Sequence, residues 1–329
     1  MSAAGPPQGA DYAPSGGSAA AELANEAASV GVNIGTLVVV GVGLIGGSCA
    51  LALRAAGATS RIVGVGRGRH NLDDALRRGI IDVAYTLDEH WASELAMADV
   101  VMVAAPLSQY PALLSMIAPA IGSQTIVTDA GSTKQDVIAT ARTTFRDAIS
   151  RFVPGHPIAG SERSGALAAD GALFAGRNVI LTPVSETAPD ASTLVTELWQ
   201  TCGARVTTMS PAAHDRVLAA VSHLPHMLAF ALVAELSSRQ DSADLFSYAG
   251  SGFRDVTRIA ASSPSMWRDV ALANRAALQD ELARYRAALD AAARMLAESD
   301  GAGLAALFER AAIARRGLDS SGQASGDVT

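Results

Sequence analysis

A run of β-branched residues that leads into closely spaced glycines constrains the fold of this chain more than any other feature. Residues 36–40 (TLVVV) predict a buried strand, and Gly41, Gly43 and Gly46 follow it in the pattern Gly-x-Gly-x-x-Gly. A helix-forming run at residues 49–56 comes next. This strand–turn–helix order makes a weak motif specific, because it is the local structure in which glycines hold the pyrophosphate of a dinucleotide at a helix N-terminus.

The three glycines have separate tasks in such a motif. Gly41 permits the tight turn, Gly43 lets the pyrophosphate approach the backbone, and Gly46 lets the helix pack close to the strand. Leu44 and Ile45 lie between the last two glycines and are expected to contact the cofactor as well.

The end of the second predicted strand, residues 61–65, bears on which cofactor binds. An NAD-selective site expects an acid there to bond the ribose 2′-hydroxyl, but Gly66 occupies the place and Arg67 and Arg69 follow. A missing carboxylate removes a repulsion against a 2′-phosphate, and a guanidinium can pair with that phosphate. The sequence therefore favours NADP over NAD, although two solvated arginines in a turn would look the same.

Strands and helices alternate along the first two thirds of the chain, which implies an α/β fold with a Rossmann-like, doubly wound sheet. Further strands are predicted at residues 100–105, 126–129, 152–154, 179–182 and 205–208. After residue 210 the pattern is purely helical, and the apolar faces of these helices need a partner. We expect a homodimer interface, while packing within one chain stays open. The expected units are a disordered leader (1–34), a dinucleotide-binding domain (35–209), a helical substrate and dimerisation domain (210–316) and a disordered tail (317–329).

Composition excludes several classes of function. A net charge of −7 without a long basic run argues against a nucleic-acid surface. Residues 27–53 carry no charge, but the glycine loop explains them better than a membrane span, and no basic leader precedes them. Cys49 and Cys202 are expected to be core thiols, and no Cys/His spacing suggests a metal site. A cytoplasmic enzyme without membrane or nucleic-acid partners is expected.

A loop of glycines and prolines at residues 152–165 carries the most informative titratable group. His156 lies between Gly155 and Pro157, where it is expected to be extended and held still. In a doubly wound sheet it would converge with Pro106 and Ser132 at the carboxyl ends of the strands, where such folds bind ligands. Ser132 is also a reasonable helix N-cap.

Basic residues in three other places are candidate functional groups, although one of the two arginines named below could instead pair with Asp255 or Asp269 while the other is solvated. Lys134, the only lysine of the chain, indicates that a compact ammonium is wanted beside a strand end. His223 and His226 share one face of a predicted helix, and substrate contact is favoured over a metal. Arg254 and Arg258 share another helix face, which favours an acid or anion between them.

Together these pieces resemble the prephenate/arogenate dehydrogenase family of tyrosine biosynthesis. The resemblance rests on the order and spacing of segments that begin with the glycine loop and run to the last helices: VGLIGGS (42–48), AP (105–106), DAGSTK (129–134), GHPIAGSE (155–162), HD (214–215), SHLPH (222–226), GFRD (252–255), TRIA (257–260) and MW (266–267). No chorismate-mutase segment precedes the nucleotide domain and few residues follow the helices, so a monofunctional member is expected.

The resemblance implies an oxidative decarboxylation in which a hydride leaves C4 of the cyclohexadienol ring and the ring carboxylate departs as CO₂. His156 matches the catalytic histidine, which accepts a hydrogen bond from the C4 hydroxyl, and Ser132 matches a serine that orients the same hydroxyl. Activity is then expected to fall as His156 protonates near a pKa of about 6.5. Ser132, Ala105 and Pro106 are also expected to line the cofactor site. The residues expected to bind substrate are Glu162, His223, His226, Arg254, Arg258 and Trp267.

Other interpretations stay open. Gly66 departs from the aspartate of many NAD-dependent members, and the choice between prephenate and arogenate is undetermined. A dehydrogenase of β-hydroxy acids would need a catalytic lysine in the helical domain, which this chain lacks. A catalytically silent nucleotide-binding sensor is the remote alternative.

Overall fold

The computed structural model describes residues 32–161 and 163–323. Its centre is a six-stranded parallel sheet in the order β3-β2-β1-β4-β5-β6. The strands are β1 (Ile34–Val40), β2 (Thr59–Gly66), β3 (Val83–Thr86), β4 (Val100–Val103), β5 (Ile126–Asp129) and β6 (Phe152–Val153). The strand order reverses at β1 and β4, so the carboxyl ends of these two strands form the crevice in which doubly wound folds bind ligands. The predicted Rossmann-like class is confirmed.

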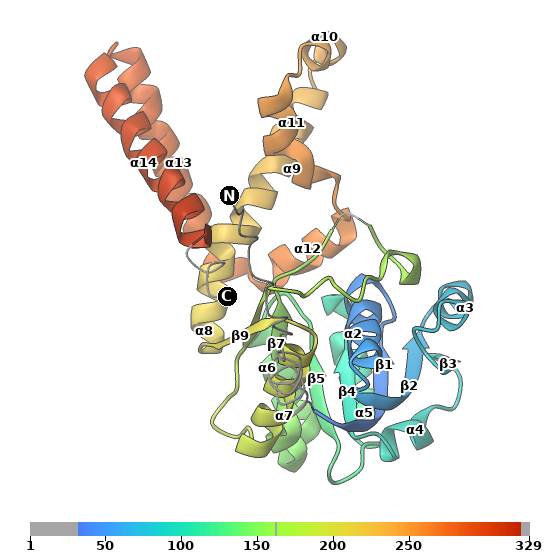
Figure 1. Cartoon of the computed structure of the whole chain (residues 1–329). Helices are drawn as coiled ribbons and strands as arrows, with labels where there is room; N and C mark the ends of the chain where they lie inside the picture. Colours follow the sequence, from blue (N-terminus) through green and yellow to red (C-terminus); the bar gives the residue numbers. More distant parts are fainter. Residues whose placement is uncertain (1–31, 162, 324–329) are drawn as a thin grey trace, which may run out of the picture.

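Helices cover both faces of this sheet because its strands are apolar on both sides (Figure 1). Leu37 and Val39 of β1 point into one core, while Val38 and Val40 point into the other. The covering helices are α2 (Leu44–Ala55), α3 (Arg69–Arg77), α4 (Ala92–Ala96), α5 (Tyr110–Ile117), α6 (Gln135–Phe145) and α7 (Pro189–Thr201). Both predicted core thiols are free and buried; Cys49 Sγ lies 3.9 Å from Cys202 Sγ.

A second, three-stranded sheet follows the first and carries the histidine loop. Its strands are β7 (Gly155–Pro157), β8 (Asn178–Leu181) and β9 (Arg205–Thr208), with β7 antiparallel to β8. The last two predicted strands therefore form their own sheet instead of extending the main one. His156 is extended as expected and pairs with Ile180.

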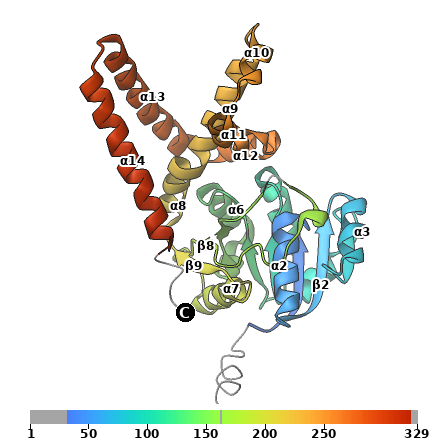
Figure 2. The ribbon, with the colours of Figure 1, turned by 45° about the horizontal axis from the view of Figure 1, so that its top comes forward.

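The helical part begins at α8 (Pro211–Leu218) and lies over the carboxyl-end edge of the main sheet (Figures 1 and 2). A π-helical turn (Ala219–His223) separates α8 from α9 (Leu224–Ser237) and ends two residues before Pro225. Short helices α10 (Ser242–Ser247), α11 (Ser251–Thr257) and α12 (Pro264–Ala273) follow, and a 3₁₀ turn (Arg258–Ala261) precedes α12.

Two helical arms project away from the α/β part and diverge from each other (Figures 1 and 2). One arm consists of the end of α9 with α10 and α11; the other is a hairpin of α13 (Arg275–Ala297) and α14 (Gly301–Gln323). Helix α14 continues past residue 317 to Gln323, so it extends into the predicted tail (317–329). Most of the predicted leader (1–34) lies outside the described residues, and its last residue, Ile34, already belongs to β1.

Within the described residues, one helical stretch, 211–237, is long and apolar enough to cross a membrane by length and composition alone. Only 28% of its most apolar window is buried. Its inner face holds His214 and His223 in polar contacts with the rest of the chain, which indicates a docked helix rather than a lipid-facing one.

Candidate active site

The glycine loop has the shape that a bound pyrophosphate requires. Gly41 has a φ of +104°, and a Cβ there would collide with the backbone of Ala104. A Cβ at Gly46 would collide with the carbonyl oxygen of Gly41, because α2 packs directly against the loop. By contrast, a Cβ at Gly43 would meet no atom within 4 Å, so this glycine faces open space at the N-terminus of α2. The open position is where a phosphate can approach the first amides of the helix.

A cavity of about 580 Å³ lies at this edge of the sheet and fits the cofactor. Of the predicted cofactor residues, six line it: Gly41, Gly43, Gly66, Arg67, Ala105 and Pro106. Leu44, Ile45 and Gly46 form the first turn of α2 beside it. Ser132 is half-buried in the β5–α6 loop and does not line this cavity.

Asn71 is a residue of this cavity that the sequence did not single out. Its Nδ2 donates to the carbonyl oxygen of Val42 (2.7 Å), and its Oδ1 accepts from the backbone amide of Ala166 (2.7 Å). The side chain thus ties the glycine loop to the segment at Gly165, which also lines the cavity. No local sequence signal marks this contact, because Asn71 and Ala166 are 95 residues apart.

The two arginines after β2 have different surroundings. Arg69 pairs with Asp73 (3.1 Å) and with Glu89 (3.7 Å), so two carboxylates already neutralise it. Arg67 is exposed and lines the cavity. Arg67 is therefore the guanidinium available to a cofactor phosphate.

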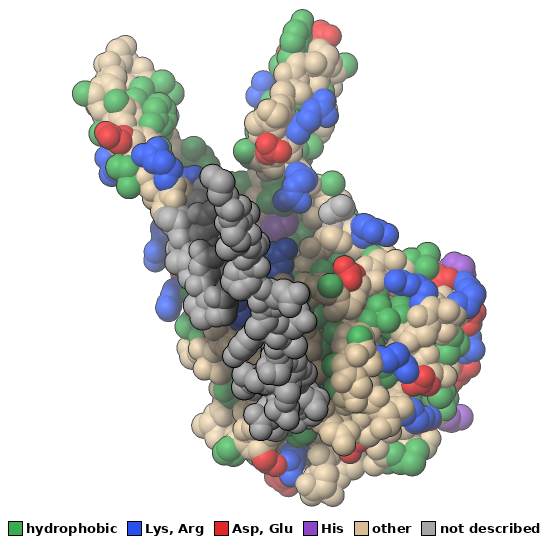
Figure 3. All heavy atoms as spheres, viewed as in Figure 1, with side chains coloured by type: hydrophobic (Ala, Val, Ile, Leu, Met, Phe, Trp, Pro, Cys, Tyr) green, Lys and Arg blue, Asp and Glu red, His purple; other side chains and the backbone are tan. Residues whose placement is uncertain are grey.

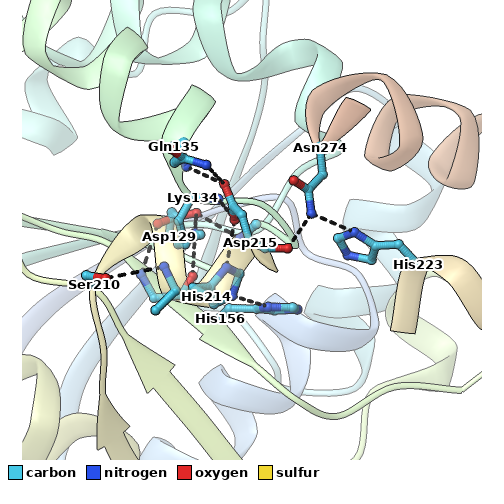
Figure 4. A network of polar contacts seen from close by, with 12 residues as sticks. Asp129, Lys134, Gln135, His156, Ser210, His214, Asp215, His223 and Asn274 are labelled. Atoms are coloured by element: carbon cyan, nitrogen blue, oxygen red, sulfur yellow. Dashed lines mark hydrogen bonds and ion pairs between the residues drawn. The ribbon is translucent and has the colours of Figure 1, made fainter. Parts of the chain in front are cut away.

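His156 is the first member of a chain of polar contacts that ends on helix α6 (Figure 4). Its Nδ1 lies 2.9 Å from Nε2 of His214, and His214 Nδ1 lies 2.8 Å from Oδ1 of Asp215. The carboxylate of Asp215 also accepts the backbone amides of Lys134 (2.8 Å) and Gln135 (2.9 Å). Asp215 is therefore the cap of α6, which begins at Gln135, and the predicted N-cap role of Ser132 is wrong.

Lys134 is fully buried and holds the two sheets together. Its Nζ donates to Asp129 Oδ2 and to the carbonyl oxygen of Gly155, both at 2.6 Å. Asp129 in turn accepts the backbone amides of Gly131 (2.8 Å) and Gly155 (3.1 Å). A buried charge is tolerated only when it is paired and hydrogen-bonded, as here. The ammonium expected beside this strand end thus fixes the backbone that carries His156.

The electrostatic surroundings keep His156 neutral. Burial lowers the pKa of His156 well below 6.5, and the nearby His214, Lys134 and His223 lower it further. The expectation that this ring titrates near its ordinary pKa is therefore wrong, because that value applies to a solvated imidazole. At neutral pH the ring can accept a hydrogen bond.

A second cavity, of about 200 Å³, lies between the π-turn, α9 and α12. The ring of His226 stacks on Trp267, with centroids 3.5 Å apart and planes at 20°. His226 Nδ1 donates to the carbonyl oxygen of Ser222 (2.9 Å), which leaves Nε2 as an acceptor. The cavity is lined by His223, His226, Met227, Phe230, Pro264, Trp267, Arg268 and Ala271.

His223 is buried and held by Asn274, a residue that the sequence did not indicate. Asn274 Nδ2 donates to the carbonyl oxygen of Asp215 (2.7 Å) and lies 3.1 Å from His223 Nδ1. An amide nitrogen can only donate, so the proton of neutral His223 is on Nε2. Burial lowers the pKa of His223 to about 4, which outweighs the opposing charge of Asp215.

The remaining predicted substrate residues differ in how well they are placed. Arg258 is exposed, and its charge lowers the pKa of His226, after burial of that ring. Arg254 is exposed too, and its Nε donates to the carbonyl oxygen of Ala249 (3.2 Å). Of these two arginines, Arg258 is the one whose charge reaches His226, while Arg268 lines the second cavity itself. Glu162 lies outside the described residues.

Comparison with known proteins identifies the family. A model of the prephenate dehydrogenase nucleotide-binding domain matches residues 49–208, and a model of the prephenate dehydrogenase dimerization domain matches residues 210–310. The chain belongs to the prephenate dehydrogenase family. It is therefore a nicotinamide-dependent dehydrogenase with a Rossmann-like domain and a helical C-terminal domain.

Relatives and solved structures resemble the chain over most of its length. It is 35% identical to prephenate dehydrogenase from Bacillus subtilis over 285 residues, which is 86% of this chain and 76% of the relative. It is 32% identical to cyclohexadienyl dehydrogenase from Zymomonas mobilis, covering 86% and 95%. A crystal structure of prephenate dehydrogenase from A. aeolicus, in complex with hydroxyphenyl propionate and NAD⁺, superposes with a TM-score of 0.82, 33% identity and coverage of 87% and 99%. Synechocystis arogenate dehydrogenase gives a TM-score of 0.72, 29% identity and coverage of 86% and 99%.

Proposed function

We propose that this enzyme catalyses the oxidative decarboxylation of prephenate to 4-hydroxyphenylpyruvate, a step of tyrosine biosynthesis. The observation that carries the proposal is the position of His156 in β7, directly after β6 of the main sheet, with its ring held by His214 and its pKa lowered by burial. When bound, the nicotinamide accepts the hydride. The pair of electrons left by the departing carboxylate then completes the aromatic ring, so no oxidant besides the cofactor is required.

The residues of this chain bind and orient the substrate. His156 accepts a hydrogen bond from the C4 hydroxyl, which favours hydride loss from the same carbon, and the product keeps this proton as its phenol. Ser132 orients the hydroxyl toward the same centre. Arg258 pairs with a substrate carboxylate, with Arg254 as the alternative. The remaining pocket residues are Glu162, His223, His226 and Trp267.

Both prephenate and arogenate are candidate substrates, because the similar proteins include a cyclohexadienyl and an arogenate dehydrogenase. The two molecules differ only in a keto or ammonium group on the side chain. The positive charge of Arg258 favours a side chain without an added positive charge, and this favours prephenate.

We further propose that the enzyme uses NADP at least as readily as NAD. Gly66 offers no carboxylate to the adenosine ribose, and Arg67 lines the cavity beside it. We also propose a homodimer, since the second matched domain is named for dimerisation, and a cytoplasmic location.

Steady-state kinetics with the four substrate–cofactor pairs test these proposals. The absorbance of reduced cofactor should rise with prephenate under both NAD and NADP, and more slowly with arogenate. If no reduced cofactor forms with any of the four pairs, the result would favour the catalytically silent nucleotide-binding sensor instead. Faster turnover of arogenate would reassign the substrate without changing the chemistry.

A further inference from the structure

The residues behind His156 form a directed chain of hydrogen bonds. His214 is fully buried between His156 and Asp215, and Asp215 is buried against the start of α6 (Figure 4). The family assignment gives neither His214 nor Asp215 a role. Neither His214 nor Asp215 lines either of the two cavities, and the side chain of His214 contacts His156 directly.

The direction of the chain follows from the carboxylate. Burial alone would raise the pKa of Asp215, but the hydrogen bonds from His214 and from the Gln135 and Lys134 amides lower it below its ordinary value. An ionised carboxylate can only accept hydrogen bonds. His214 Nδ1 must therefore carry a proton, and where this is the only proton of the ring, Nε2 is bare toward His156.

His156 must consequently donate from its own Nδ1, because that atom is 2.9 Å from the bare Nε2 of His214. A neutral imidazole carries one proton, so His156 Nε2 is left unprotonated. Among the described residues, no hydrogen bond engages this nitrogen. This nitrogen can therefore accept a hydrogen bond from a substrate hydroxyl.

We propose that His214 and Asp215 are positioning residues that hold the proton of His156 on Nδ1 and so keep Nε2 as the acceptor for the substrate hydroxyl. This inference rests on the proposed function for the role of His156. The opposite arrangement, with a proton on His156 Nε2, would turn the acceptor into a donor and block the contact. In serine proteases, loss of the carboxylate behind a catalytic histidine produces such a wrong tautomer and lowers turnover by about 10⁴-fold.

The direct test is the tautomer of each ring in the resting wild-type protein. Long-range ¹H–¹⁵N spectra of protein labelled in its six histidines report which nitrogen of each ring carries the proton, and single His variants assign the signals. The proposal expects Nδ1–H for both His156 and His214 at pH 7.5. A proton on His156 Nε2, or a doubly protonated His214, would overturn it. This result does not depend on activity, so failure of the proposed function would be seen separately as silence with prephenate and arogenate.

Substitution of the carboxylate tests the consequence for turnover. Asp215→Asn keeps an oxygen for the α6 amides but can donate to His214, which reverses the chain and moves the His156 proton to Nε2. We expect kcat to fall at least about a hundredfold with less than about a threefold change in KM. Asp136→Asn is the matched control. It also removes one carboxylate charge near the N-terminus of α6, because Asp136 lies in the first turn of that helix. It should keep normal turnover. Near-normal turnover of Asp215→Asn would contradict the proposal.

Two variants of His214 separate positioning from folding. His214→Gln can present its amide oxygen near the place of Nε2, so it should retain part of the turnover and the Nδ1–H form of His156. His214→Phe fills the space without an acceptor and should lose at least as much turnover as Asp215→Asn. Equal activity of the Gln and Phe variants would show that only the shape of residue 214 matters. If Asp215→Asn fails to fold, the wild-type spectrum and the Gln–Phe pair still decide the question.

Discussion

The proposed role of His156 requires that its imidazole ring is neutral at the pH at which the enzyme works. Burial lowers the pKa of His156 most, and the nearby His214, Lys134 and His223 lower it further; Lys134 lies just before α6, His214 in α8 and His223 in the π-turn. Sequence alone identified His156 from its loop, but not its pKa. The groups that shift it are 22 to 67 residues away in the chain, and only the fold brings them together.

The acidic limb of the pH–rate profile tests this electrostatic account. The imidazolium form of His156 cannot accept a hydrogen bond, so activity is complete above its pKa and is lost as the pH falls through it. Because the pKa is lowered, the limb in kcat/KM should lie well below pH 6.5. Protein stability at each pH is the control, measured by circular dichroism. A limb at pH 6.5 or above would show that His156 is solvated in the free enzyme.

The two arginines of the helical domain give a prediction at the same scale. Arg258→Ala should raise KM for prephenate with a smaller effect on kcat, because a charge-assisted contact to a carboxylate is worth about 2–5 kcal/mol. Arg254→Ala is the matched control, since Arg254 bonds the carbonyl oxygen of Ala249. Steady-state kinetics of both variants measure this. A steep KM effect in Arg254→Ala alone would reverse the assignment.

At the scale of secondary structure, local signals predicted most elements. The apolar runs gave the strands β1, β4 and β5, and the glycine pattern gave the loop before α2. The start of α6 was missed, because its cap is Asp215, 80 residues further along the chain than Gln135. The π-turn at Ala219–His223 also has no local sequence signal, although His223 is its last residue. Long-range contacts decide these features, and a single sequence does not encode them in a readable pattern.

The turn after β2 carries the prediction for cofactor choice. Gly66→Asp should shift preference toward NAD, because the new carboxylate accepts from the ribose 2′-hydroxyl and repels a 2′-phosphate. The backbone can accommodate it, since a Cβ at Gly66 would lie 3.4 Å from the nearest atom, the side-chain Cδ2 of Leu72. The measurement is kcat/KM for NAD and NADP.

Arginine variants of the same turn control this prediction. Arg67→Ala should lower kcat/KM for NADP more than kcat/KM for NAD. Arg69→Ala should change neither value, because Asp73 and Glu89 already neutralise Arg69. A wild-type enzyme that strongly prefers NAD, with no effect of Arg67→Ala, would remove Arg67 from the cofactor site.

At the scale of the whole molecule, the helical arms expose apolar surface that a dimer would bury. Hydrophobic side chains are visible along both arms in Figure 3, and Leu289, Leu296, Phe308 and Ile313 of the α13–α14 hairpin are all more than half exposed. Exposed large apolar side chains that gather on one part of a soluble protein are typical of association sites. We therefore expect the helical domain to bury this apolar surface against the helical domain of a second subunit.

Sedimentation measures this expectation. Wild-type protein should sediment as a dimer, and Leu296→Glu with Phe308→Glu should raise the dissociation constant at least about tenfold, because charges are costly in a buried apolar interface. Met97→Glu is the control: Met97 is 64% exposed, close to the 67% of Leu296, but it lies on the nucleotide domain next to α4. A monomeric wild type, or equal weakening by Met97→Glu, would contradict a dimer through the hairpin.

Turnover by His156→Asn tests most directly whether neutral His156 carries the oxidation of prephenate. Asparagine keeps a polar side chain of similar reach but cannot share a proton as an imidazole does. With prephenate and saturating cofactor, kcat should fall at least about a hundredfold while KM changes little. Near-normal formation of reduced cofactor and 4-hydroxyphenylpyruvate by this variant would remove His156 from the mechanism.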